Sequence, residues 1–130
     1  MNKELIAQFA DFLEKEVGDW EFDFAQLVSK TVEKDDKKCG AVCCAAGWLP
    51  RFDAKNWRWG LDGFNVHLVG SLCEYNIKDD ISSYFGLEIS LVRNVFHNFS
   101  MGGVKDNFYG KIDSEVQRSD VVGALRALIK

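Results

Sequence analysis

Apolar residues recur at intervals of three and four positions over the first seventeen residues of the chain, with polar residues between them. This period is that of an amphipathic helix with one buried face. Gly18 follows the pattern and is a common signal for the end of a helix. The stretch predicts the clearest helix of the chain, and its buried face would consist of Leu5, Ile6, Phe9, Phe12, Leu13 and Val17.

The same period returns in the second half of the chain. It predicts one helix from Ile77 to Phe85 and another from Ile89 to Phe99, joined at Gly86. Near the C-terminus, the Ser119 hydroxyl can accept a hydrogen bond from the first backbone amides of a last helix. The apolar face of that helix would carry Val122, Leu125 and Ile129.

The middle of the chain has weaker patterns. A short helix can begin near Asp23, ahead of a charged loop at residues 31–38. Gly40 to Leu49 predicts a further helix. Pro50 should end it, because the residue before a proline disfavours helical geometry.

Two long connections separate the helices, one rich in aromatic residues at positions 51–65 and one rich in glycine at 100–111. A short strand pair is expected around Phe64 to Val69. No repeat or linker divides the 130 residues, a length typical of one ordinary domain. The sequence therefore predicts a single compact, mainly α domain (1–130), with room for a short β-hairpin.

Composition limits the location and the partners. No apolar run approaches the roughly 20 residues of a membrane helix. The N-terminal stretch lacks the apolar core of a signal peptide, so we expect a cytoplasmic protein with no membrane partner. The formal net charge of −4 is spread along the chain and is too acidic for general phosphate binding.

Three cysteines lie within six residues in the stretch CGAVCCAAGW, residues 39–48. Their spacing along a helix does not suit a disulfide, and a cytoplasmic location favours reduced thiols. Zinc usually takes four ligands from two short-spaced pairs, and the chain offers no such pairs, so we expect no metal and no cofactor. Zinc binding stays an alternative, with the candidate ligands Cys39, Cys43, Cys44, Cys73, His67 and His97.

A second alternative is a reactive thiol at Cys39, where the start of a helix can lower a thiol pKa. Catalysis would then need His67 or His97 nearby as a base. The favoured interpretation is packing, because cysteine behaves as a small apolar residue, and it places Cys44 buried and reduced. Small residues would let another helix approach beside Trp48, namely Ala41, Cys44, Ala45 and Gly47.

Four stretches together carry a family resemblance: FDF at 22–24, CGAVCCAAGW at 39–48, YFGLE at 84–88 and LRALI at 125–129. In this order they resemble a family of small uncharacterised proteins of phages, prophages and bacteria, with the central motif C-G-T-x-x-C-x-x-G-W-A. The matching residues are Cys39, Gly40, Cys44, Gly47 and Trp48, whereas Ala41, Cys43 and Leu49 depart from the motif. The resemblance implies a compact helical protein in a phage or prophage setting and brings no activity with it.

Residues 80–97 also fit a helix-turn-helix with Gly86 at the turn. The side chains that would face DNA are Glu88, Ser90, Arg93, Asn94 and His97. They include one fixed positive charge, whereas operator-binding proteins neutralise several phosphates. An ordinary helical hairpin needs the same glycine. DNA binding through Arg93, Asn94 and His97 is therefore an alternative, and we do not expect specific nucleic-acid binding.

No catalytic template is present. The sequence contains no phosphate-binding loop, no dinucleotide fingerprint, and no serine-hydrolase or zinc-protease motif. It therefore offers no catalytic residue. It favours an accessory protein that acts by binding another, unidentified protein, with modulation of the host or of its defence as one such role. It leaves an enzyme open.

The densest mixture of aromatic and basic residues lies between Pro50 and Phe64. Tryptophan and arginine are enriched at binding hot spots. In an extended segment residues 57 and 59 face one way and residue 58 the other, so we expect Arg58 on the surface and Trp57 or Trp59 partly exposed. Alternatively, these rings cover the core. The predicted docking residues are Phe52, Trp57, Arg58 and Trp59.

Overall fold

The computed structural model describes residues 1–18, 22, 44–59, 66–70, 77–96 and 116–130. Within them the helices are α1 (Lys3–Glu16), α2 (Leu49–Phe52), α3 (Ile77–Phe85), α4 (Ile89–Val95) and α5 (Arg118–Leu128). One antiparallel pair of strands, β1 (Trp57–Trp59) and β2 (Val66–Leu68), completes the described part. The predicted mainly α fold with a short hairpin is confirmed. No helix among the described residues is long and apolar enough to cross a membrane.

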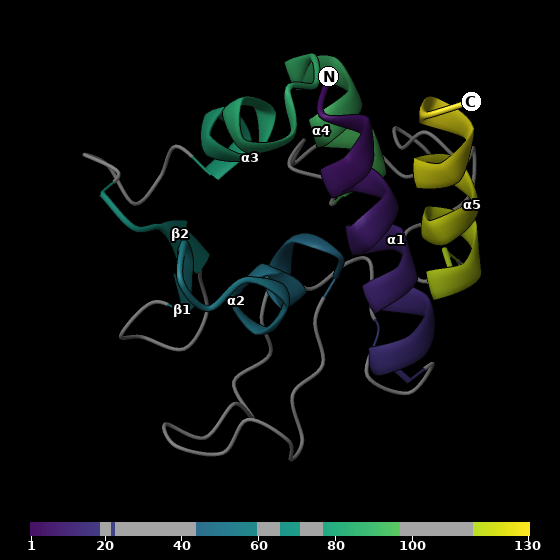
Figure 1. Cartoon of the computed structure of the whole chain (residues 1–130), viewed down its shortest axis with the longest axis horizontal. Helices are drawn as coiled ribbons and strands as arrows, with labels where there is room; N and C mark the ends of the chain where they lie inside the picture. Colours follow the sequence, from purple (N-terminus) through teal and green to yellow (C-terminus); the bar gives the residue numbers. More distant parts are fainter. Residues whose placement is uncertain (19–21, 23–43, 60–65, 71–76, 97–115) are drawn as a thin grey trace.

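Figure 1 shows α1 and α5 lying side by side, with α3 and α4 across one end of α1 and the strands on the side away from α5. The predictions of a helix near Asp23, a charged loop at 31–38 and a glycine-rich loop at 100–111 lie outside the described residues.

Helix α1 forms where the apolar period predicted it. The Asn2 side-chain oxygen accepts a hydrogen bond from the Leu5 amide at 3.1 Å and caps the helix start. The helix ends at Glu16, so Val17 has extended backbone instead of helical geometry, although its side chain is buried as predicted. The buried face within the helix consists of Ile6, Phe9, Ala10 and Leu13.

Helix α3 matches its predicted bounds, and α4 begins at the predicted Ile89. Gly86 joins them with a φ of +69°, a conformation that glycine adopts without steric cost. The Leu87 amide donates to the Ser82 carbonyl at 3.0 Å, the backbone bond of a Schellman cap. Helix α4 ends at Val95, with Phe96 in the capping position, so the predicted end at Phe99 is wrong.

The prediction that Pro50 ends a helix is wrong. Residues 46–48 form a 3-10 turn, and Pro50 lies in the first turn of α2. Proline is tolerated there because a first-turn amide has no partner within the helix. Leu49 is helical despite preceding a proline, with φ −55° and ψ −41°. The neighbouring core positions Cys44, Ala45 and Trp48 are buried, as the packing interpretation predicted.

The prediction that Ser119 caps the last helix is also wrong. Helix α5 begins at Arg118, and Gln117 occupies the capping position. The Asp120 carboxylate accepts a hydrogen bond from the Gln117 amide at 2.9 Å, which fixes the cap at Gln117, two residues before Ser119. The predicted apolar face forms, with Val122 and Leu125 buried.

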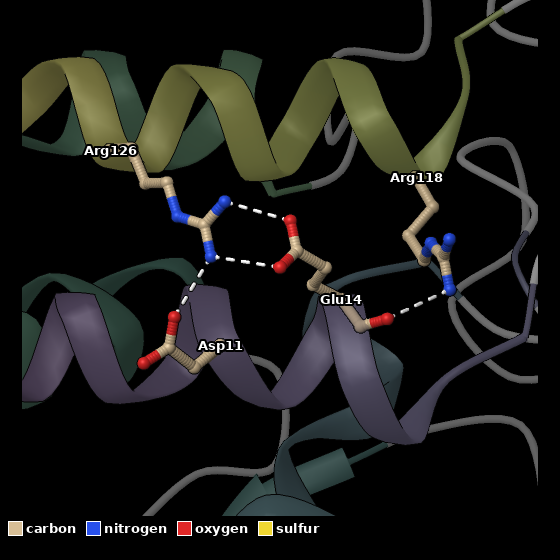
Figure 2. Close-up of polar contacts among 4 residues, drawn as sticks. All are labelled: Asp11, Glu14, Arg118 and Arg126. Carbon is tan, nitrogen blue, oxygen red and sulfur yellow. Dashed lines mark hydrogen bonds and ion pairs between the residues drawn. The ribbon is translucent and has the colours of Figure 1, made fainter.

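Two arginines join α5 to α1, in two different ways (Figure 2). Arg118 donates to the backbone carbonyls of Glu14, at 3.2 Å, and Val17, which lie at the C-terminal end of α1. Arg126 forms exposed ion pairs with Glu14 at 2.7 Å and Asp11 at 2.8 Å. The hydrogen bond from Arg126 is the main reason that the pKa of Glu14 lies below its usual 4.5.

We expect Arg118→Ala to lower the free energy of unfolding by about 1–2 kcal/mol, because two carbonyls at the end of α1 lose their donor and the bond to the Val17 carbonyl is partly buried. Arg126→Ala is the matched control and should cost less, since exposed ion pairs are screened by water and salt. The contribution of Glu14 is present above pH 4.5 and is lost as the pH falls through the lowered pKa of Glu14 in the folded state. Urea unfolding at two salt concentrations measures both variants. Equal losses of unfolding free energy in the two variants would contradict the assignment of Arg118 as the side chain that caps the C-terminal end of α1.

Candidate docking surface on the hairpin

The candidate site lies on the hairpin of β1 and β2. Trp57 is opposite Leu68, Arg58 opposite His67 and Trp59 opposite Val66. The Val69 amide donates to the Asn56 carbonyl at 2.7 Å and extends the pairing by one position. The expected strand pair around Phe64 to Val69 therefore includes β2. Its partner β1 comes from the segment predicted as a connection.

The inner face of the hairpin belongs to the core. Trp57 is completely buried and its ring meets Tyr84 edge-on at 5.4 Å. Trp59 is half-buried, and its indole N–H donates to the Gly47 carbonyl at 3.0 Å. The expected partial exposure holds for Trp59. Trp57 is a core residue, which removes it from the predicted docking residues.

Phe52 also packs mainly against the core. It is half-buried, and its ring lies 5.0 Å from Phe9 and 5.4 Å from Phe12 on α1. The alternative interpretation, in which the aromatic rings of this stretch cover the core, therefore describes Phe52 and Trp57.

The opposite side of the hairpin is open. Strand alternation and the cross-strand pairs place four residues on it, which we call the outer face: Asn56, Arg58, His67 and Val69. Arg58 is exposed, as predicted, and its Nη1 donates to the Trp57 carbonyl at 3.2 Å. Val69 is 50% exposed and His67 is half-buried. Arg58 and Val69 are therefore the groups of this face that a partner can reach, whereas the Nδ1 atom of His67 is buried and the Asn56 side-chain amide is bonded to Asp53.

A carboxylate at the end of α2 anchors the hairpin to α3. Asp53 Oδ2 accepts from the Tyr84 hydroxyl at 2.6 Å and from the Asn56 side-chain amide at 2.7 Å. The Asp53 carbonyl accepts the Trp57 amide at 3.0 Å. Burial raises the pKa of Asp53, but the hydrogen bonds from Tyr84 and Asn56 outweigh it, so the net shift is below the usual 3.8. Burial, followed by the bond to Asp53, raises the pKa of Tyr84 above its usual 10.0.

The residues around this anchor carry an excess of positive charge. Positions 51–59 contain Arg51, Lys55 and Arg58 but a single carboxylate, Asp53. Lys55 is exposed, whereas Arg51 is half-buried with its guanidinium 5.4 Å from the centre of the Trp48 ring. Asp53 is bonded to Tyr84 and Asn56, and the described residues show no ion pair between Asp53 and Arg58.

We expect Tyr84→Phe to lower the free energy of unfolding by about 1–2 kcal/mol, the low end for a hydrogen bond to a charged group because the pair is only partly buried. Asp53 ionises below its usual pKa in the folded state, so this contribution is present above pH 3.8 and is lost as the pH falls further. Urea unfolding of both proteins at pH 7 and pH 3 measures the difference. A loss that is as large at pH 3 would contradict the assignment.

The described residues give little support to the helix-turn-helix alternative. Arg93 and Asn94 lie in α4, but their side chains and the whole of His97 are outside the described part. Among the described residues of α3, α4 and their junction, the exposed ionisable side chains are Asp79 and Glu88, both acidic. This surface would repel a phosphate backbone.

The zinc-site and reactive-thiol alternatives depend on cysteines of which only Cys44 lies among the described residues. Cys44 is a buried thiol, whereas Cys39, Cys43 and Cys73 lie outside the described residues, as do Gly40 and Ala41 of the motif. Within the described ranges, no three His, Cys, Asp or Glu side chains are grouped as a metal site would require. The remaining described motif residues pack: Trp48 is buried, and the Gly47 carbonyl accepts the Trp59 indole.

The sequence predicted Arg58 at this surface, whereas the predicted Trp59 lies on the inner face of the hairpin. The sequence did not indicate Val69, His67 or the Asp53–Tyr84 anchor. The single available signal was the run Asp-Ala-Lys-Asn at 53–56, a composition typical of a turn closed by an aspartate side chain. Comparisons of the chain with protein-family models, curated proteins and solved structures find no match.

Proposed function

We propose that this chain is a small accessory protein that acts by binding another protein, and that the partner docks on the outer face of the hairpin. The observation that carries the proposal is the state of Arg58. It is exposed, its guanidinium is oriented by the Trp57 carbonyl, and no carboxylate of the described chain pairs with it. Oriented arginines beside aromatic and apolar side chains are typical of binding hot spots.

The surrounding structure supports a preformed surface. The Asp53–Tyr84 bond holds the start of β1 to α3, and the Trp59–Gly47 bond holds its end to the turn before α2. A surface that is ordered before binding loses little conformational entropy when a partner docks. The motif resemblance supports placing this accessory role in a phage or prophage setting in the cytoplasm.

We expect Arg58→Glu to abolish partner binding while the free energy of unfolding changes by less than about 0.5 kcal/mol, since the side chain is exposed and touches little. Lys3→Glu, an exposed residue at the start of α1, is the control with the same change in net charge. Native protein and both variants would serve as baits in quantitative affinity capture from a bacterial lysate.

Proteins retained by the native chain and by Lys3→Glu, but reduced at least tenfold with Arg58→Glu, would support the outer face as the docking site. The same set of proteins on all three baits would contradict it. Recovery of a reproducible DNA sequence instead of a protein would favour the helix-turn-helix alternative.

A further inference from the structure

We infer that the segment recognised by the outer face is acidic: a stretch of the partner protein with carboxylates next to an apolar side chain. The inference rests on the proposed docking function and specifies the chemistry of the partner. It follows from the donors left open on Arg58, the local excess of positive charge and the position of Val69.

Arg58 carries the largest set of open donors on this face. A guanidinium has five N–H groups in a planar fork, and the described structure gives one bond, to the Trp57 carbonyl at 3.2 Å. That bond restricts the rotation of the fork and leaves the other donors for a partner. A carboxylate is the group that pairs with such a fork through two parallel hydrogen bonds.

The charge around Arg58 favours the same partner. Lys55 is exposed in the turn just before β1, and the carboxylate of Asp53 is occupied by Tyr84 and Asn56. The whole chain nevertheless has a net charge of −4, so the positive charge near the hairpin is local. An acidic segment would be attracted to this face and repelled by the exposed acidic residues elsewhere, which sets where and how it docks.

The apolar part of the surface is Val69. It is 50% exposed, and its amide donates to the carbonyl of Asn56, two residues before Arg58 in the chain. One apolar side chain of the partner can therefore contact Val69 while a neighbouring carboxylate reaches Arg58.

Recognition through side chains is favoured over addition of a strand to β1. Both backbone groups of Trp57 are already bonded, the amide to the Asp53 carbonyl at 3.0 Å and the carbonyl to Arg58 at 3.2 Å. A partner strand along β1 would have to break these bonds, whereas a carboxylate on Arg58 leaves them in place.

The test is a selection of peptides from a random display library on the native protein, followed by affinity measurements. We expect the selected peptides to be enriched in Asp and Glu, to lose at least tenfold in affinity for Arg58→Glu, and to bind more weakly as salt rises. Replacing their carboxylates by amides should cause a similar loss. Arg58→Lys, which keeps the charge but not the fork, should weaken binding severalfold. A structural role of Arg58 alone would not produce this dependence on peptide charge.

The other outcomes separate the inference from the function on which it rests. Peptides that need Arg58 but carry no carboxylate would overturn the acidic partner and leave the docking surface standing. Peptides that bind equally to native protein and Arg58→Glu, or no selected peptide at all, would overturn both. Binding of a single-stranded oligonucleotide that needs Arg58 and displaces the peptides would overturn the inference in favour of nucleic acid.

Discussion

Replacing Phe9 by alanine should lower the free energy of unfolding by about 3–5 kcal/mol, the usual cost of emptying a buried phenylalanine site. Phe9 is completely buried in the middle of α1. The surrounding rings come from three other helices or turns: Phe52 at 5.0 Å, Phe85 at 5.4 Å and Phe96 at 5.8 Å. Because these segments are also held by other contacts, they cannot all collapse into the space, and a cavity remains.

Such a loss is a large share of the stability of a small domain, which is typically about 5–15 kcal/mol. Urea unfolding followed by tryptophan fluorescence measures it. Phe12→Ala is the control: Phe12 lies on the same helix, 6.2 Å from Phe9, but is half-buried and should cost less than half as much. Equal losses would show that Phe9 is not the centre of the core.

The sequence predicted best the helices that show a sustained apolar period. Helix α3 has its predicted bounds, and Gly86 takes the left-handed turn that the predicted helical hairpin needed. These features depend on residues close together in the chain, so periodicity and turn chemistry were sufficient to locate them.

The error at Ser119 is a local one, because Gln117 and Asp120 form the capping box instead. Other errors arise where tertiary contacts decide the local structure. Proline is found both just after a helix and in the first turn of one, and Pro50 lies in the first turn of α2, directly after a buried turn. The strand β1 is three residues long, which is too short for the sequence to show that it pairs with β2. Trp57 is buried because Tyr84, far along the chain, covers it.

The candidate site, too, could be predicted only in part from the sequence. Charge and alternation place Arg58 on the surface, because a guanidinium is rarely buried without a partner. His67 and Val69 join it through cross-strand pairing, and the Asp53–Tyr84 bond spans 31 residues. No local pattern reports such a separation, so the anchor could be recognised only from the fold.

The second large effect is expected at Gly86, where alanine should lower the free energy of unfolding by about 2–4 kcal/mol. The φ of +69° alone strains any residue with a Cβ. A Cβ there would also lie 3.0 Å from the Met1 Cα and 3.1 Å from the Met1 nitrogen, both backbone atoms that cannot move aside by rotating a side chain. Moving them would disturb the bond from the Asn2 amide to the Phe85 carbonyl, 2.8 Å long, and with it the cap of α1.

Gly70→Ala separates the two causes. Gly70 also has a positive φ, +90°, but a Cβ there would meet no atom within 4 Å. It should therefore show the conformational cost alone, about 1–2 kcal/mol. The excess loss in Gly86→Ala then measures the contact between the start of α1 and the α3–α4 turn. Hydrogen exchange should show faster exchange at the Leu5 amide in Gly86→Ala and not in Gly70→Ala, since only the former displaces the Asn2 cap. Equal unfolding free energies and equal exchange in the two variants would show that the N-terminal segment does not pack against this turn.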